Sequence, residues 1–108
     1  MKIKNMSQHY ILDEKGNPVV EPDILKWARW FETADRLVAS ERVDRSLVFT
    51  VFLGLDYDFY GRKAICWETM VFGGGLDGET DRCGGSRLMA LAMHTLMVKR
   101  VRSKAESA

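Results

Sequence analysis

Two apolar runs, rich in aromatic and β-branched residues, flank one short turn and constrain this chain more than any other feature. They are residues 46–55 (Ser-Leu-Val-Phe-Thr-Val-Phe-Leu-Gly-Leu) and 63–72 (Lys-Ala-Ile-Cys-Trp-Glu-Thr-Met-Val-Phe). The stretch 56–62 between them combines turn-forming Asp and Gly with aromatic residues. This pattern predicts a β-hairpin. Because the first run is apolar at both alternating sets of positions, we expect a strand that is central in its sheet or covered on both faces.

Shorter patterns predict the rest of the fold. Pro pre-sets the first helical turn, Asp favours the positive end of the helix dipole, and Ser is a preferred N-cap. The expected elements are strands at 9–12, 19–20 and 37–43, a helix from about Pro22 to Asp35, a glycine-rich loop at 73–85, and a helix from Ser86 to about Arg102. Together they predict one α+β domain over residues 1–108, with an ordered core at about 8–102. Its architecture is an antiparallel sheet of about four or five strands with two helices packed on it.

The composition bounds the class of protein. With 108 residues, 46% hydrophobic and 29% charged, the chain has the profile of a globular domain. Its formal net charge of +1 provides no global field to attract nucleic acid. No apolar signal segment or membrane span is recognised, so we expect a protein of the cytoplasm. In that reducing compartment Cys66 and Cys83 are expected to stay free thiols.

The motifs of phosphate, metal and thiol chemistry are incomplete. The glycine-rich stretch 73–85 is not followed by the Lys-Ser or Lys-Thr of a P-loop. No Cys-x-x-Cys or His-x-x-x-His spacing is present for a zinc site. We therefore expect no metal, no cofactor and no assigned catalytic residue. A Cys83 nucleophile with His94 as its base is a minor alternative.

Glu68 is the most unusual polar residue, because it shares its face of the predicted strand with apolar neighbours. A carboxylate in such surroundings must be paired, protonated or at an edge. We favour a structural ion-pair partner, such as Arg29 or Arg36. The alternative is acid–base chemistry in a small enzyme, with Asp56 or Asp58 beside Glu68.

Two surfaces are candidates for binding a partner. The hairpin tip carries aromatic residues beside cations, the residue types that dominate binding hot spots. The final helix is apolar nearly all round, with a methionine every four residues, which favours a core position and leaves an intermolecular contact or homo-oligomer as the alternative. The candidate residues are Tyr57, Phe59, Tyr60 and Arg62 at the tip, and Met89, Met93 and Met97 on the helix. Nucleic acid is disfavoured, since no basic field supports the aromatic tip.

Four segments resemble a family of short proteins encoded by tailed bacteriophages and prophages. They are residues 9–19 (His-Tyr-Ile-Leu-Asp-Glu-Lys-Gly-Asn-Pro-Val), 21–32 (Glu-Pro-Asp-Ile-Leu-Lys-Trp-Ala-Arg-Trp-Phe-Glu), 50–57 (Thr-Val-Phe-Leu-Gly-Leu-Asp-Tyr) and 67–74 (Trp-Glu-Thr-Met-Val-Phe-Gly-Gly). The resemblance covers roughly residues 9–102 and departs at 83–86, where Cys-Gly-Gly-Ser replaces a Tyr followed by acidic, polar residues. The resemblance implies no catalytic residues.

The phage-like context implies a non-enzymatic accessory protein that binds a host protein in the host bacterial cytoplasm. Inhibition of a host defence or regulatory factor is one such role. A small enzyme with a carboxylate cluster and a nucleic-acid-binding module are the alternatives.

Overall fold

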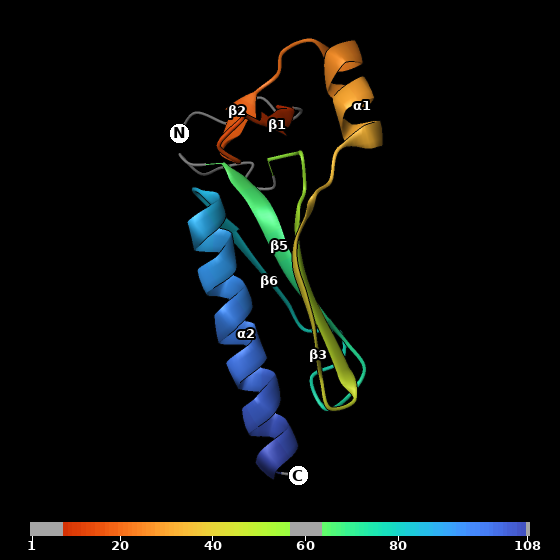
Figure 1. Cartoon of the computed structure of the whole chain (residues 1–108), viewed down its shortest axis with the longest axis vertical. Helices are drawn as coiled ribbons and strands as arrows, with labels where there is room; N and C mark the ends of the chain where they lie inside the picture. The colour runs from red at the N-terminus through yellow and green to blue at the C-terminus, as the bar shows by residue number, and fades with distance from the viewer. Residues whose placement is uncertain (1–7, 57–63, 108) are drawn as a thin grey trace, which may run out of the picture.

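The computed structural model describes residues 8–56 and 64–107, which form two antiparallel sheets and two helices (Figure 1). The larger sheet has strand order β3-β4-β5-β6, and the smaller one pairs β1 with β2. The elements are β1 (Tyr10–Leu12), β2 (Pro18–Val20), α1 (Ile24–Thr33), β3 (Leu37–Val43), β4 (Ser46–Phe52), β5 (Ile65–Phe72), β6 (Thr80–Gly84) and α2 (Arg87–Ser107). The predicted α+β class with an antiparallel sheet is therefore confirmed.

The predicted hairpin forms the centre of the larger sheet. β4 and β5 are antiparallel, with Leu47 opposite Phe72 near one end and Phe52 opposite Trp67 at the other. β3 joins β4 through a tight turn in which Asp44 has a φ of +53°, a conformation that Asp tolerates better than most residues. Most of the predicted turn at 56–62 falls on residues 57–63, which lie outside the described residues.

The hydrophobic core lies between the larger sheet and α2, which packs along one face of it (Figure 1). The register explains this, because every second residue of β4 is buried. The buried hydrophobic residues are Ala90, Met93, Met97, Val98 and Val101 from the helix and Val43, Val48, Phe52, Cys66, Trp67 and Val71 from the strands. Met93 and Met97 thus take the core position that the sequence favours for the methionine stripe.

α1 lies at one end of the sheet, beside the β1–β2 hairpin (Figure 1). The indole Nε1 of Trp27 donates to the carbonyl oxygens of Tyr10 and Gly54, at 3.1 and 3.0 Å. Trp30 packs edge-on against Phe52, with ring centroids 5.8 Å apart. These tryptophans hold α1 against the small hairpin and the end of β4. Of the two described helices, only α2 therefore runs along a face of the larger sheet.

The helix ends differ from the prediction. Asp23 is the N-cap of α1 and not part of its first turn, because its side chain accepts from the backbone N–H groups of the second and third helical residues. The helix ends at Thr33, before the predicted Asp35. α2 continues to Ser107, past the predicted end at Arg102, since no Gly or Pro interrupts that tail. Among the described residues, neither helix combines the length and apolarity that crossing a membrane requires.

The glycine-rich stretch is not a loop throughout, which corrects the sequence interpretation. Thr80–Gly84 form β6, with Arg82 opposite Glu68 of β5. The pairing satisfies backbone N–H and C=O groups of β5 that would otherwise lack partners. The glycines that turn the chain come earlier. Gly73 has a φ of +81°, and a Cβ there would collide with the carbonyl oxygen of Arg45.

Candidate functional site

The face of the larger sheet that points away from α2 is apolar at its centre. Side chains alternate along a strand, so the residues between the buried positions of β4 and β5 project to this other face. The register pairs them as Leu47 with Phe72, Phe49 with Met70, and Val51 with Glu68. An antiparallel sheet covered on one side normally shows polar residues on the other. Here five of these six side chains are hydrophobic.

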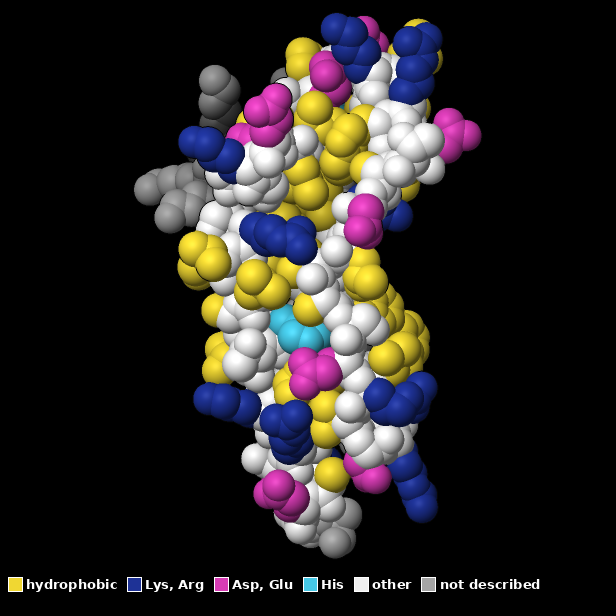
Figure 2. Space-filling model, viewed as in Figure 1, with side chains coloured by type: hydrophobic (Ala, Val, Ile, Leu, Met, Phe, Trp, Pro, Cys, Tyr) yellow, Lys and Arg dark blue, Asp and Glu magenta, His cyan; other side chains and the backbone are white. Residues whose placement is uncertain are grey.

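Phe49 and Phe72 form the middle of this surface. Their rings stack, with centroids 5.1 Å apart and planes inclined by 12°. Phe72 is 46% exposed, and Leu37, opposite Val51 on β3, is 45% exposed. Figure 2 shows hydrophobic side chains along the side of the molecule away from α2. We call the set Leu37, Leu47, Phe49, Val51, Met70 and Phe72 the open face.

Polar residues frame the open face. On the β3 side, Ser40 and Arg42 are exposed, and the register places them on the same face. On the β6 side, Thr80 and Arg82 are exposed and lie on this face as well. The surface therefore has an apolar centre of two strands and a polar border on each outer strand.

Glu68 has a structural ion-pair partner, as predicted, but the partner is neither Arg29 nor Arg36. The Nε of Arg82 donates to Glu68 Oε2 at 2.8 Å. The sequence interpretation missed Arg82 because it treated β6 as a loop. Since the Arg82 side chain is about half exposed, we expect the pair to contribute no more than about 1 kcal/mol to stability. Its clearer effect is to neutralise the Glu68 carboxylate at the border of the open face.

The candidate binding residues named from sequence fall in three different places. Tyr57, Phe59, Tyr60 and Arg62 lie outside the described residues. Met93 and Met97 are buried in the core, with 6% and 2% exposure, so a partner cannot reach them while α2 stays on the sheet. Met89 is 56% exposed and remains accessible.

The open face itself was not named from the sequence. The sequence does contain a signal for a second apolar sheet face, because the run 46–55 is apolar at both alternating sets of positions. That pattern predicts a central strand or a strand covered on both faces. β4 is indeed central, yet among the described elements only α2 packs along its sheet. Phe49 and Phe72 are thus left half-exposed or exposed.

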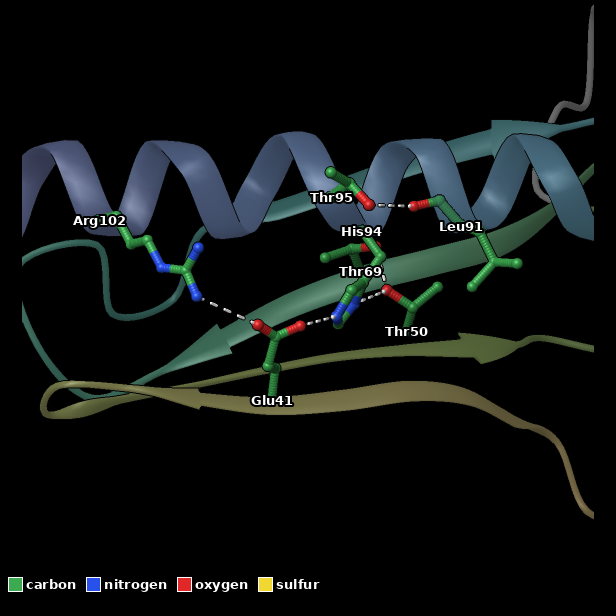
Figure 3. Close-up of polar contacts among 7 residues, drawn as sticks. All are labelled: Glu41, Thr50, Thr69, Leu91, His94, Thr95 and Arg102. Atoms are coloured by element: carbon green, nitrogen blue, oxygen red, sulfur yellow. Dashed lines mark hydrogen bonds and ion pairs between the residues drawn. The ribbon is translucent and has the colours of Figure 1, made fainter.

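A chain of polar side chains crosses the core beneath α2 (Figure 3). Thr69 Oγ1 lies 2.5 Å from Thr50 Oγ1, which lies 2.8 Å from His94 Nδ1. On the other side of the ring, Nε2 lies 3.4 Å from Glu41 Oε1, and Glu41 Oε2 lies 3.5 Å from the Arg102 guanidinium. Both threonines and the histidine are buried. The signal for this chain was two threonines at otherwise apolar positions of facing strands.

This polar chain is not arranged for catalysis. A hydroxyl, an imidazole and a carboxylate in sequence resemble a nucleophile, a base and its orienting group. However, Thr50 is completely buried, so a substrate has no approach to its hydroxyl. The alternative dyad of Cys83 and His94 gains no support either, because no hydrogen bond joins the two side chains within the described residues and the Nδ1 of His94 is hydrogen-bonded to Thr50. We interpret the chain as a structural network that positions α2 on the sheet.

The carboxylate hypothesis gains no support from the described residues. Asp56 Oδ1 accepts a hydrogen bond from the backbone N–H of Ile65 at 2.9 Å, which is a structural role at the start of β5. Glu68 is paired with Arg82, and Asp58 lies outside the described residues. Within residues 8–56 and 64–107, no three His, Cys, Asp or Glu side chains are grouped so as to hold a metal ion.

The two cysteine thiols are expected to react very differently. Burial, together with the nearby Asp81 carboxylate, raises the pKa of the half-buried Cys83 thiol, and Cys66 is only 1% exposed. Because the thiolate is the reactive form, Cys83 will react with a disulfide reagent more slowly than a free thiol at neutral pH. The reaction rate of Cys83 will increase with pH, and the midpoint of that increase will lie at a higher pH than for an unperturbed thiol. Cys66 will react only on unfolding.

Timed reaction with a disulfide reagent across a range of pH, with Cys83→Ser as the comparison, measures the pH dependence of Cys83 and the reactivity of Cys66. The variant should lose the only native-state reaction. A reaction that persists in Cys83→Ser, or a midpoint below that of an unperturbed thiol, would contradict the expectation.

The fold and the surface define a two-layer α+β domain, with one sheet face covered by a helix and the other apolar and not covered by any element of the described residues. Comparisons of the chain with models of protein families, with curated proteins and with solved structures find no match.

Proposed function

We propose that this protein is a non-enzymatic binding protein whose open face docks a partner protein. The observation that carries the proposal is the stacked pair of Phe49 and Phe72, at the centre of a sheet face along which no described element packs. Soluble domains rarely leave such apolar patches uncovered, and the patches that they do leave are often interaction sites.

The layout of the open face supports this function. Protein interfaces combine an apolar, aromatic centre with a polar border. Phe49 and Phe72 provide the centre, and Arg42 and the Glu68–Arg82 pair lie at the border. Fully burying one large hydrophobic side chain contributes about 1.5–3 kcal/mol. Completing the burial of six partly exposed ones therefore offers about 5 kcal/mol or more, against the entropic cost of association.

The charges of the border indicate what kind of partner fits. Glu68 and Arg82 neutralise one another, whereas Arg42 makes no ion pair within the described residues. A flat apolar protein surface with a carboxylate at one edge complements this arrangement. A nucleic acid does not, because its phosphates require several cations along the contact.

The phage-like resemblance of the sequence supports a host protein as the partner. In that setting, the protein acts in the bacterial cytoplasm by occupying a surface of a host defence or regulatory factor. Binding alone is sufficient for such inhibition, and it requires no catalytic residue, metal or cofactor.

The test of this function uses Phe72→Asp, which places a charge at the centre of the open face on an already exposed position. The matched control is Leu88→Asp on α2, a position that is 76% exposed on the other layer. Both variants should keep the wild-type circular dichroism. Proteins captured from bacterial lysate by the wild type would be purified and titrated calorimetrically. We expect Phe72→Asp to weaken binding at least about 30-fold, as for a hot-spot residue, with the control unchanged.

Two results would overturn the proposal. The first is equal binding by Phe72→Asp and the wild type, which would place the contact elsewhere. The second is a wild-type homodimer in light scattering that Phe72→Asp alone dissociates, because a second copy would then occupy the open face.

A further inference from the structure

A shallow groove of about 590 Å³ lies on the other layer of the molecule, between the C-terminal half of α2 and the turn that follows β5. Leu76 of that turn and Leu96 of the helix are its apolar residues. Leu96 is 61% exposed, although it belongs to a helix that buries its other side against the sheet. The groove thus has an apolar surface that an entering side chain can cover.

The charged side chains of this groove are all cationic. They are Lys99, Arg100 and Lys104, and the remaining lining residues are serines. Arg100 lies 3.6 Å from the Glu79 carboxylate, which partly neutralises it. Lys99 and Lys104 make no ion pair within residues 8–56 and 64–107. Two lysines without an ion-pair partner among the described residues therefore line the groove together with Leu76 and Leu96.

We propose that this groove binds an acidic segment of a partner protein, which inserts an apolar side chain against Leu76 and Leu96 and places carboxylates on Lys99 and Lys104. Opposite charges steer such an encounter and fix its orientation. A second copy of the chain is a poor occupant, because a symmetric contact centred on this groove would bring the cations of one copy against the same cations of the other.

The lining of the groove favours a protein segment over a lipid surface. A helix that lies on a membrane presents a continuous apolar stripe bordered by cations. The groove supplies only Leu96 and the half-buried Leu76 as apolar residues, so it offers no continuous stripe to a bilayer. A carboxylate-bearing segment matches the charge of the groove.

The probe is a short fluorescent peptide in which Glu and Leu alternate, measured by anisotropy with the full-length protein. Lys99→Glu combined with Lys104→Glu should weaken its binding by at least about tenfold. The matched control, Lys15→Glu with Lys26→Glu, makes the same change in net charge at two exposed positions elsewhere. It should bind like the wild type. Leu96→Ala should weaken binding severalfold, whereas Leu88→Ala on the outer surface should not.

Three results would overturn the inference. They are equal losses in the two double variants, no effect of Leu96→Ala, or binding of the wild type to phosphatidylglycerol vesicles with none to the peptide. A peptide with Gln in place of Glu should bind at least about tenfold more weakly. The inference is independent of the open face, because Phe72→Asp should leave peptide binding intact. Failure of either proposal therefore leaves the other standing.

Discussion

Replacing Trp67 by alanine will lower the free energy of unfolding by about 4 kcal/mol, the upper part of the range for large-to-small core changes. Trp67 is completely buried, packs edge-on against Phe52 with centroids 4.9 Å apart, and donates from Nε1 to the Gly85 carbonyl at 2.8 Å. The indole therefore joins β5 to the segment that leads into α2. A domain of this size has about 5–15 kcal/mol in total, so the variant will lose about a quarter or more of its stability.

The control for this prediction is Trp30→Ala, which removes the same side chain from a half-buried position at the end of the sheet. We expect it to cost about 1.5 kcal/mol, in proportion to its smaller burial. Urea unfolding followed by far-ultraviolet circular dichroism measures both without relying on tryptophan emission. Equal losses in the two variants would contradict the assignment of Trp67 as the principal core residue.

Replacing Thr50 by valine will lower the free energy of unfolding by about 3 kcal/mol, although the two side chains have nearly the same shape. Thr50 is the shared partner of Thr69 and His94 in the polar chain beneath α2. Its loss leaves two buried polar groups without that partner, and each unsatisfied group costs about 1–3 kcal/mol.

The polar chain also makes a prediction about a pair of changes. In the variant with both Thr50→Val and His94→Leu, the imidazole that valine would leave unsatisfied is absent. Replacing both partners by apolar groups is close to neutral in many proteins, so the double variant should be more stable than the sum of the single changes by about 1 kcal/mol or more. Guanidinium unfolding of the four proteins at one pH measures this coupling. Strictly additive costs would show that Thr50 and His94 do not act as a unit.

Local sequence patterns predicted most of the secondary structure. The strand expected at 37–43 matches β3, and the hairpin of β4 and β5 follows from β-branched and aromatic runs that disfavour other conformations. The second helix follows from a long apolar segment after a Ser, and its first backbone hydrogen bonds run from the N–H groups of Met89 and Ala90 to the carbonyl oxygen of Ser86. These elements could be predicted because their signals lie within a few residues of one another.

β6 could not be predicted in the same way. Its five residues include one β-branched side chain, two charges and a terminal glycine, which are typical of a loop. It becomes a strand because β5 presents an edge of unpaired backbone groups beside it. The ion-pair partner of Glu68 could not be predicted for the same reason, since Arg82 reaches that carboxylate only when β6 is paired with β5.

The candidate sites depended on the tertiary structure even more strongly. The period of two along β4 determined that Phe49 shares a face with Leu47 and Val51, and the period of the helix determined that Met93 and Met97 lie close together. Neither period predicts which side of a strand or helix will be covered by the rest of the protein. α2 lies on the face of Val48 and Thr50, which buried the methionines named as binding residues and left Phe49 and Phe72 open. The sequence by itself thus determined most of the elements, β6 excepted, and the side chains that share each face, because those follow from local backbone geometry. Only the tertiary structure decided which face is core and which is surface, because that choice rests on packing between segments far apart in the chain.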